Sequence, residues 1–567
     1  MTENRPPKPN PPAQTDTPED PARRRLLGAL AITGAALATG CQTLATPASG
    51  GTTAAPVGAN AALDAALRER IQRVVVIFLE NRSFNNLFAR FPGLELPLEG
   101  LAPERFAQRD RDGKLLARLP PIWHGLVPHA QTVNGKTWQL GEDALAGLPN
   151  APWLLRTPDG QPLPHELVTA SPIHLFYRNQ MQINGGKNDM FVAWGNHGAL
   201  PMGYYATDAD NFNLYQLARE YTLCDNFFMG AFGGSFLNHQ YLVTARPPVY
   251  PDADHSPAKH RIAVLEDGPT GYRLKLSDTS RASAMGGPPT FASHASLTPD
   301  FYAVNTFGPP YAPSANVDPD DPALANLSHP NILPPQDYPT IGDTLSAKGI
   351  DWAWYAGAWQ MALDGKGNSG ISREFPISPN FQVHHQPLNY FRQFGPGTAA
   401  RARHLRDGGT GNTAATNRFI ADIEAGRLPQ VVFYKPQGNL NMHAGESDLT
   451  AADVHVAHIL DALQRSPGWE TTMVIITVDE NGGWWDHVAP PKADRWGPGT
   501  RIPAWIVSPH AKKGHVDHTV YDTGSIQRFL NRRFGLDPLP GIVLRDNAMR
   551  QHHGFAPGDL TAALELA

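Results

Sequence analysis

Two acidic pairs, far apart in the sequence, have the residue types needed to bind a metal ion. Glu80 and Asn81 directly follow one apolar run, and Asp479 and Glu480 follow another. Carboxylate and amide oxygens are ligands for hard or borderline divalent cations. Each pair alone is equally consistent with a structural role, because Asn81 or Ser83 could cap a helix and Asp479 could open a glycine-rich turn. Together they favour a divalent-cation site.

Ser235 follows two glycines, which let the backbone turn tightly and present a hydroxyl group. The segment is not the nucleophile elbow of α/β hydrolases, because Leu237 stands where that motif needs a second glycine. A serine acyl esterase is therefore disfavoured. An ordinary Gly-Ser loop remains the alternative for this segment taken alone. Beside a metal ion, the serine would be a nucleophile without needing a histidine base.

Histidines outside the acidic pairs could bind phosphate oxygens or protonate a leaving alkoxide. The candidates are His174, His384, His385 and His443. Any one of them is more commonly a surface or loop residue, since the chain has 22 histidines. Lys435 and the pair at 512–513 are interpreted as solvated charges.

The elements that must position these residues alternate along the chain. Apolar runs rich in Val and Ile predict buried strands at 74–79, 431–434, 473–478 and 504–507, with a weaker pattern at 352–355. Amphipathic segments predict helices at 212–220, 341–348, 417–425, 451–464 and 525–534. This order predicts an α/β fold with a mostly parallel sheet covered by helices on both faces, and ligands bind beyond the carboxyl ends of such strands.

The composition is that of a large folded protein without a nucleic-acid signal. The chain has 567 residues, 41% of them hydrophobic, and a formal net charge of −6, which gives no general attraction to nucleic acid or anionic lipid. Residues 92–170 and 247–339 are rich in Pro, Gly and Asp and have little periodicity. We expect them to be long loop or cap insertions within one catalytic domain at 61–567.

The first 60 residues predict an export signal followed by a flexible tether. Arg23 and Arg24 precede Leu26 and a short apolar stretch, the pattern of a signal read by the twin-arginine export machinery. Cys41 at the end of that stretch could be lipidated and tether the protein to a membrane, or it could be incidental. Besides Cys41 the chain has only Cys224, so the mature protein needs no disulfide. We expect a periplasmic protein or a membrane-anchored lipoprotein.

Several motifs in the same order resemble the bacterial phospholipase C / acid phosphatase phosphoesterase family. They are Glu80-Asn81-Arg82-Ser83-Phe84, the stretch 174–205, Leu223-Cys224-Asp225-Asn226-Phe227-Phe228, and Asp479-Glu480-Asn481-Gly482-Gly483 followed by Asp486-His487-Val488. The resemblance spans about 74–534 and implies an alkaline-phosphatase-like fold with a single divalent metal ion. It implies that the metal ligands are Glu80, Asn81, Asp479, Glu480 and Ser235. It places Asn238, His174, His384, His385 and His443 around the phosphate, with His443 as a catalytic residue.

Two details point to the acid phosphatase branch of this family. Phospholipase C members usually have a threonine and then an Asn-Arg pair, where this chain has Ser235 and then Asn238-His239; the chain also carries His384-His385-Gln386-Pro387. Asn85 departs from the family, which usually has an aspartate there. The resemblance implies hydrolysis of phosphate monoesters through a phosphoserine at Ser235. The alternatives are a phospholipase C acting on lipid head groups and, less favoured, a surface lipoprotein that only binds.

Overall fold

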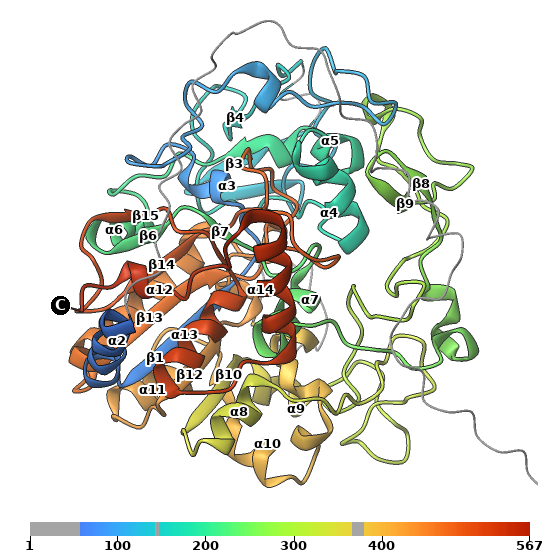
Figure 1. Cartoon of the computed structure of the whole chain (residues 1–567). Helices are drawn as coiled ribbons and strands as arrows, with labels where there is room; N and C mark the ends of the chain where they lie inside the picture. The colour runs from blue at the N-terminus through green and yellow to red at the C-terminus, as the bar shows by residue number, and fades with distance from the viewer. Residues whose placement is uncertain (1–56, 142–144, 146, 366–378, 567) are drawn as a thin grey trace, which may run out of the picture. The chain divides into compact units, whose positions relative to one another are not determined.

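One large sheet organises the part of the chain that the structure describes. The structure is a computed structural model, and it describes residues 57–141, 145, 147–365 and 379–566. Eight strands of these residues lie in the order β11-β10-β12-β1-β13-β14-β6-β15 (Figure 1). Their bounds are Arg73–Leu79 (β1), Thr222–Cys224 (β6), Trp352–Gly357 (β10), Leu405–Gly409 (β11), Val431–Lys435 (β12), Thr472–Val478 (β13), Ala504–Val507 (β14) and His515–Asp517 (β15). All neighbouring pairs are parallel except those that β14 makes with β13 and β6. The predicted mostly parallel α/β fold is confirmed.

The helices lie between the strands, as the alternation predicts. They span Val57–Arg70 (α2), Phe84–Phe88 (α3), Phe176–Ile183 (α4), Phe191–Trp194 (α5), Asn213–Glu220 (α6), Ser235–Thr244 (α7), Ile341–Ala347 (α8), Trp359–Leu363 (α9), Ala399–His404 (α10), Arg418–Glu424 (α11), Leu449–Arg465 (α12), Gly524–Phe534 (α13) and Pro540–His553 (α14). All five predicted strands and all five predicted helices are present, with boundaries that shift by two residues or fewer.

Two neighbouring side chains of β12 show that helices cover both faces of the sheet. Successive side chains of a strand point to opposite faces. The ring of Tyr434 stacks on Phe419 of α11, with 4.3 Å between ring centroids. The ring of Phe433 instead stacks on Trp354 of β10, whose indole lies 6.2 Å from the ring of His239 on α7. Thus α11 covers one face, together with α12 that packs against it, and α7 covers the other.

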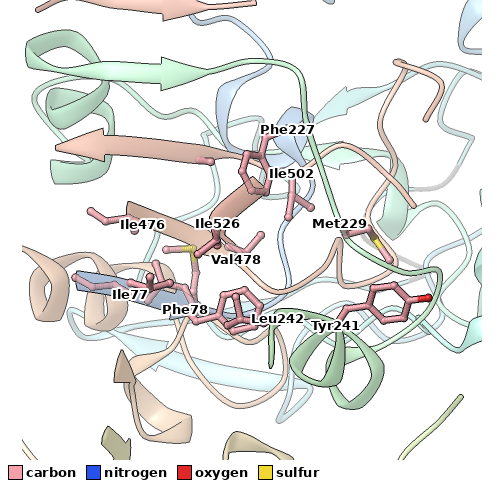
Figure 2. Close-up of a cluster of buried hydrophobic side chains, with 14 of the residues drawn as sticks. Ile77, Phe78, Phe227, Met229, Tyr241, Leu242, Ile476, Val478, Ile502 and Ile526 are labelled. Atoms are coloured by element: carbon pink, nitrogen blue, oxygen red, sulfur yellow. The ribbon is translucent and has the colours of Figure 1, made fainter. Parts of the chain in front are cut away.

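Apolar side chains fill the space between the sheet and α7. Figure 2 shows Phe78 of β1, Leu242 of α7 and Ile526 of α13 within one cluster of buried side chains. All three are fully buried. Truncating a buried phenylalanine to alanine costs about 3–5 kcal/mol. This cluster therefore holds α7, which begins at Ser235, against the carboxyl end of β1.

The long segments 92–170 and 247–339 contain short strands separated by turns. The remaining short strands pair as β2 (Ala130–Val133) with β3 (Lys136–Gln139), β4 (Trp153–Leu154) with β5 (Gly203–Tyr204), β7 (Phe227–Phe228) with β16 (Tyr521–Asp522), and β8 (Leu265–Gly268) with β9 (Gly271–Leu274).

The predicted export signal and Cys41 lie outside the described residues. Helix α2 begins at Val57, inside the stretch predicted as a tether. None of the described helices has the length and apolar character required to cross a membrane.

Candidate active site

The register of β1 and β13 brings the two acidic pairs to one edge of the sheet. Leu79 pairs with Val478, so Glu80 and Asp479 are the first residues beyond two adjacent parallel strands. The backbone N–H of Asp479 donates to the carbonyl of Leu79 at 3.1 Å. The backbone N–H of Asn81 donates to Asp479 Oδ1 at 3.2 Å. The loops that follow the two strands are thus joined directly.

Close packing of these two loops requires a glycine. Gly482 has φ of 62°, in the left-handed region, and a Cβ on it would lie 2.6 Å from the backbone oxygen of Asn81. Such an approach leaves no room for any side chain. The glycines that follow Asp479-Glu480 therefore serve to bring the second acidic pair against the first.

The hydroxyl group of Ser235 points into the acidic cluster. Gly233 has φ of 93°, and a Cβ there would lie 2.5 Å from the backbone at the start of α4, so the turn into α7 requires glycine. Ser235 Oγ donates to Glu80 Oε2 at 3.0 Å. It also lies 3.4 Å from both Asn81 Oδ1 and Glu480 Oε1. The structure therefore gathers three predicted metal ligands around the hydroxyl oxygen of a fourth, Ser235.

The three carboxylates of this cluster fit a divalent cation. Glu80, Asp479 and Glu480 are fully buried. Burial and then the charge of Glu80 raise the pKa of Asp479 to about 8, and burial and then the charge of Asp479 raise the pKa of Glu480 well above its usual range. Asp479 Oδ2 has no hydrogen-bond partner. Oxygen ligands this close, with an open acceptor atom among them, need a positive charge to be stable as anions.

The sequence-based interpretation of Lys435 as a solvated charge is wrong. Its side chain is fully buried, and Nζ lies 2.6 Å from Glu80 Oε1. Burial acts to raise the pKa of Glu80, but the ammonium group of Lys435, followed by His385, outweighs it and holds that pKa well below its usual range. A buried lysine is stable when it is paired with a carboxylate in this way.

His384 and His385 line the cluster from the segment before β11. His385 Nε2 lies 2.9 Å from Glu80 Oε1. Both ring nitrogens of His384 are buried without a hydrogen-bond partner. Burial and then the charge of Lys435 lower the pKa of His385 to about 4, and burial and then His385 lower the pKa of His384 well below its usual range. The ring is therefore neutral, so one of its two nitrogens carries a hydrogen that it can donate to an anion.

His174 and His443 stand at the accessible side of the cluster, with ring centroids 5.9 Å apart. His174 Nδ1 contacts the carbonyl of Pro172 at 2.7 Å, and Nε2 lies 3.3 Å from Asn81 Nδ2. His443 Nδ1 contacts the carbonyl of Ala444 at 2.5 Å. Since each carbonyl accepts a hydrogen bond from Nδ1–H, the Nε2 atom of each neutral ring has no hydrogen and can accept a proton. Burial, and for His174 the neighbouring His443, lowers both pKa values, that of His174 to about 4.

Asn238 does not point at the cluster as the resemblance implies. Its Oδ1 accepts from the backbone N–H of Ala231 at 2.9 Å, and its Nδ2 donates to the carbonyls of Ala231 at 3.1 Å and Gly234 at 3.2 Å. Both polar ends of the side chain therefore bind the loop before Ser235. In this structure Asn238 holds that turn in place.

His239 is a residue of the site that sequence reasoning missed. It is fully buried, its Nδ1 lies 2.8 Å from the carbonyl of Ser235 and 3.6 Å from Asp479 Oδ2, and its Nε2 has no partner. Together with Glu80 and Asp479 it forms a group whose donor atoms lie within 4.8 Å of one another, as a metal site requires. The spacing of four residues from Ser235 would have pointed to it, had α7 been predicted as a helix.

Asn85 occupies the position where the resembling family has an aspartate. Its backbone N–H donates to Asp486 Oδ2 at 2.9 Å, and its side chain lies 2.9 Å from His487 Nδ1. Arg501 binds both Asp486 and Asn85. Its Nε donates to Asp486 Oδ1 at 3.0 Å, and its Nη2 donates to Asn85 Oδ1 at 3.2 Å. The asparagine thus still links the loop after β1 to the loop after β13.

Comparisons with known proteins support a phosphoric ester hydrolase, in agreement with this arrangement of side chains. A family model described as the Phosphoesterase family matches residues 71–537. This interval is most of the chain and contains every candidate site residue named above, so the chain belongs to the phosphoesterase family, as its motifs predict.

The chain is also similar to curated phospholipases. Phospholipase C A of Mycobacterium tuberculosis is 24% identical over 532 residues, which cover 88% of this chain and 78% of that protein. The non-hemolytic phospholipase C of Pseudomonas aeruginosa is 28% identical over 260 residues, which cover 40% of this chain and only 33% of that protein. A solved structure of a protein in the alkaline phosphatase superfamily from Vibrio parahaemolyticus is 12% identical, with a TM-score of 0.30, and the match covers 67% of this chain and 72% of that one.

Proposed function

We propose that the protein is a metal-dependent phosphomonoesterase, an acid phosphatase that passes the phosphoryl group through Ser235. The observation that carries this proposal is the placement of Ser235 Oγ, which lies 3.0 Å from Glu80 Oε2 and 3.4 Å from two further oxygen ligands. A hydroxyl group needs a nearby base or a metal ion to become a nucleophile. The groups around Ser235 are the oxygen atoms of candidate metal ligands, which supports the second route.

We assign one group of site residues to activating the nucleophile and another to binding the phosphate. A divalent cation would be held by Glu80, Asn81, Asp479 and Glu480, and its positive charge would lower the pKa of the Ser235 hydroxyl group so that its proton passes to solvent. Ser235 Oγ attacks phosphorus in line with the ester oxygen, so that the Oγ–P bond forms as the ester P–O bond breaks. Either open nitrogen of His384 can carry the single N–H of the neutral ring and donate it to a phosphate oxygen.

His443 is the group we assign to proton transfer. Its Nδ1 is held by the carbonyl of Ala444, which leaves Nε2 free. The charge of a bound phosphate ester favours the protonated ring, against the burial that lowers its pKa. Protonated His443 gives its proton to the departing alcohol, and the neutral ring then accepts a proton from the water that cleaves the phosphoserine. Ser235 leaves phosphorus as the alkoxide and regains its proton from solvent, and His443 ends protonated, so both residues finish the cycle as they began it.

A phospholipase C is the second candidate, and the relatives named above favour it. Against it stand Ser235 and the pair His384-His385, the features that resemble the acid phosphatase branch. Both activities use the same cation and nucleophile and differ in whether the phosphate carries one ester bond or two. The choice therefore depends on how many phosphate oxygens the histidines must bind.

A substrate panel tests the proposal. Nitrophenyl phosphate and phosphatidylcholine vesicles are assayed in parallel at pH values on both sides of neutrality, with and without a chelator. We expect faster hydrolysis of the monoester, more so below neutrality, and loss of both activities with the chelator. Faster cleavage of phosphatidylcholine than of any monoester would assign the protein to the phospholipase group. Full activity after metal removal would refute the metal-dependent mechanism.

We also propose that the protein is exported in the folded state through the twin-arginine machinery. Arg23 and Arg24 before Leu26 support this route, and Cys41 supports a lipid tether at the membrane. A cation site whose ligands come from distant strands must be folded to bind metal, which fits a pathway that carries folded proteins. Normal processing of Cys41→Ala would argue against the lipid tether.

A further inference from the structure

The mechanism above gives no role to Lys435, although it contacts the site directly. Lys435 is the last residue of β12, the strand next to β1, and its side chain has no exposed surface. Nζ donates to the carbonyl of Leu79 at 3.0 Å and lies 5.4 Å from the ring centroid of Phe78. An ammonium group excluded from water in this way is stable only when it is paired, here with the carboxylate of Glu80.

The two oxygens of Glu80 have different neighbours. Oε1 lies 2.6 Å from Lys435 Nζ and 2.9 Å from His385 Nε2. Oε2 accepts a hydrogen bond from Ser235 Oγ at 3.0 Å. Oε2 is therefore the oxygen of Glu80 that contacts the Ser235 hydroxyl group, a further candidate ligand. The contact with Lys435 orients Glu80 to offer one oxygen to a cation and keeps the other occupied.

The fixed charges of the cluster match one divalent cation. With a cation bound, the carboxylates of Glu80, Asp479 and Glu480 would all be ionised, and together with the ammonium group of Lys435 they would sum to a charge of −2. A buried site that keeps a net charge is costly, so a single dication completes it. Without the lysine the cluster would carry one further negative charge.

A second group of donors shares Glu80. Its carboxylate and the nitrogens of His384 and His385 lie within 4.8 Å of one another, close enough to hold an ion of their own. Lys435 contacts the same carboxylate, so an ion there would lie beside an ammonium group. We propose that Lys435 is a positioning residue that holds Glu80 as a one-oxygen ligand and limits the site to one divalent cation. This inference rests on the metal site of the proposed function.

Metal stoichiometry tests the inference without relying on activity. Chelator-stripped protein is titrated with Zn²⁺ by calorimetry, and bound metal is counted after gel filtration. We expect one Zn²⁺ per chain for the wild type and for Lys435→Arg, which keeps the charge. Lys435→Met should bind two, and Lys435→Met combined with His384→Ala should return to one. The exposed residue Lys492 provides a matched control, because Lys492→Met should leave one ion bound.

Each outcome bears on a separate claim. One ion bound to Lys435→Met, with unchanged affinity, would overturn the inference and leave the proposed function intact. Two ions in the wild type would also overturn it, even if Lys435→Met did not fold. No ion in the wild type would refute the proposed function itself. In the folded Lys435→Met variant we expect turnover to fall by about 10- to 100-fold, as when a partner of a metal ligand is removed, with recovery in Lys435→Arg.

Discussion

Replacing Ser235 with alanine separates the phosphoserine mechanism from direct attack by water. The change removes one oxygen, and alanine is a better helix former than serine at the start of α7, so the fold should be preserved. No other hydroxyl group lies among the predicted metal ligands in the described part of the site. We therefore expect turnover to fall by about three orders of magnitude, which corresponds to about 4 kcal/mol in activation free energy.

Acid quenching provides the assay. Wild-type enzyme stopped during turnover of a ³²P-labelled monoester should carry label on the peptide that contains Ser235, and the alanine variant should carry none while still binding inorganic phosphate. Ser508→Ala is a matched control, because Ser508 is also buried but donates to Thr472 at the opposite end of β13. Inversion of configuration at a chiral phosphorus, with only a moderate loss in Ser235→Ala, would refute the reasoning.

Three further predictions concern the metal, the stability and the export of the protein. Asp479→Asn should lose bound metal and nearly all activity while its circular dichroism spectrum is unchanged, and full metal content would contradict the ligand assignment. Asp522 is buried between Arg528 and Arg545, so Asp522→Asn should lower the free energy of unfolding by about 3–5 kcal/mol in urea melts near neutral pH. Burial acts to raise the pKa of Asp522, but the two arginines hold it below its usual value. The stabilisation is therefore present above the unfolded pKa of about 4 and lost as the pH falls through the folded value, so the two proteins should converge in acid. Replacing Arg23 and Arg24 with lysine should retain the protein in the cytoplasm, and unchanged export in cell fractionation would exclude the twin-arginine route.

The sheet and its polar edge could be predicted because the signals are local. The run 74–79 is apolar on both faces, as a central parallel strand must be, and it stops at Glu80. The run before Asp479 has the same form. Polar residues directly after two such strands indicate where a site lies, since parallel strands end at the same edge.

Helix α7 could not be predicted in the same way. It is buried along its whole length, so it has no polar face and no helical period in its apolar residues. His239 was missed for that reason. The orientation of Asn238 could not be predicted for a different reason, since its side-chain direction depends on how the loop at Ala231 closes.

Lys435 shows a third limit of the sequence. A lysine at the end of an apolar strand is usually solvated. Its burial depends on Glu80, which lies 355 positions earlier in the chain and beside it in the sheet. Charge compensation between residues so far apart has no local pattern.

The position of β1 in the sheet sets an order of events during synthesis. It is the first of the eight strands to leave the ribosome, yet both its neighbours, β12 and β13, are encoded more than 350 residues later. Until β13 has been synthesised as far as Val478, β1 lacks the neighbour that pairs with one of its two edges. That edge exposes unpaired backbone groups of an apolar strand, which can pair with other chains. We therefore expect a nascent chain to expose this strand for most of translation, and we expect a product that terminates before β13 to be prone to aggregation or proteolysis.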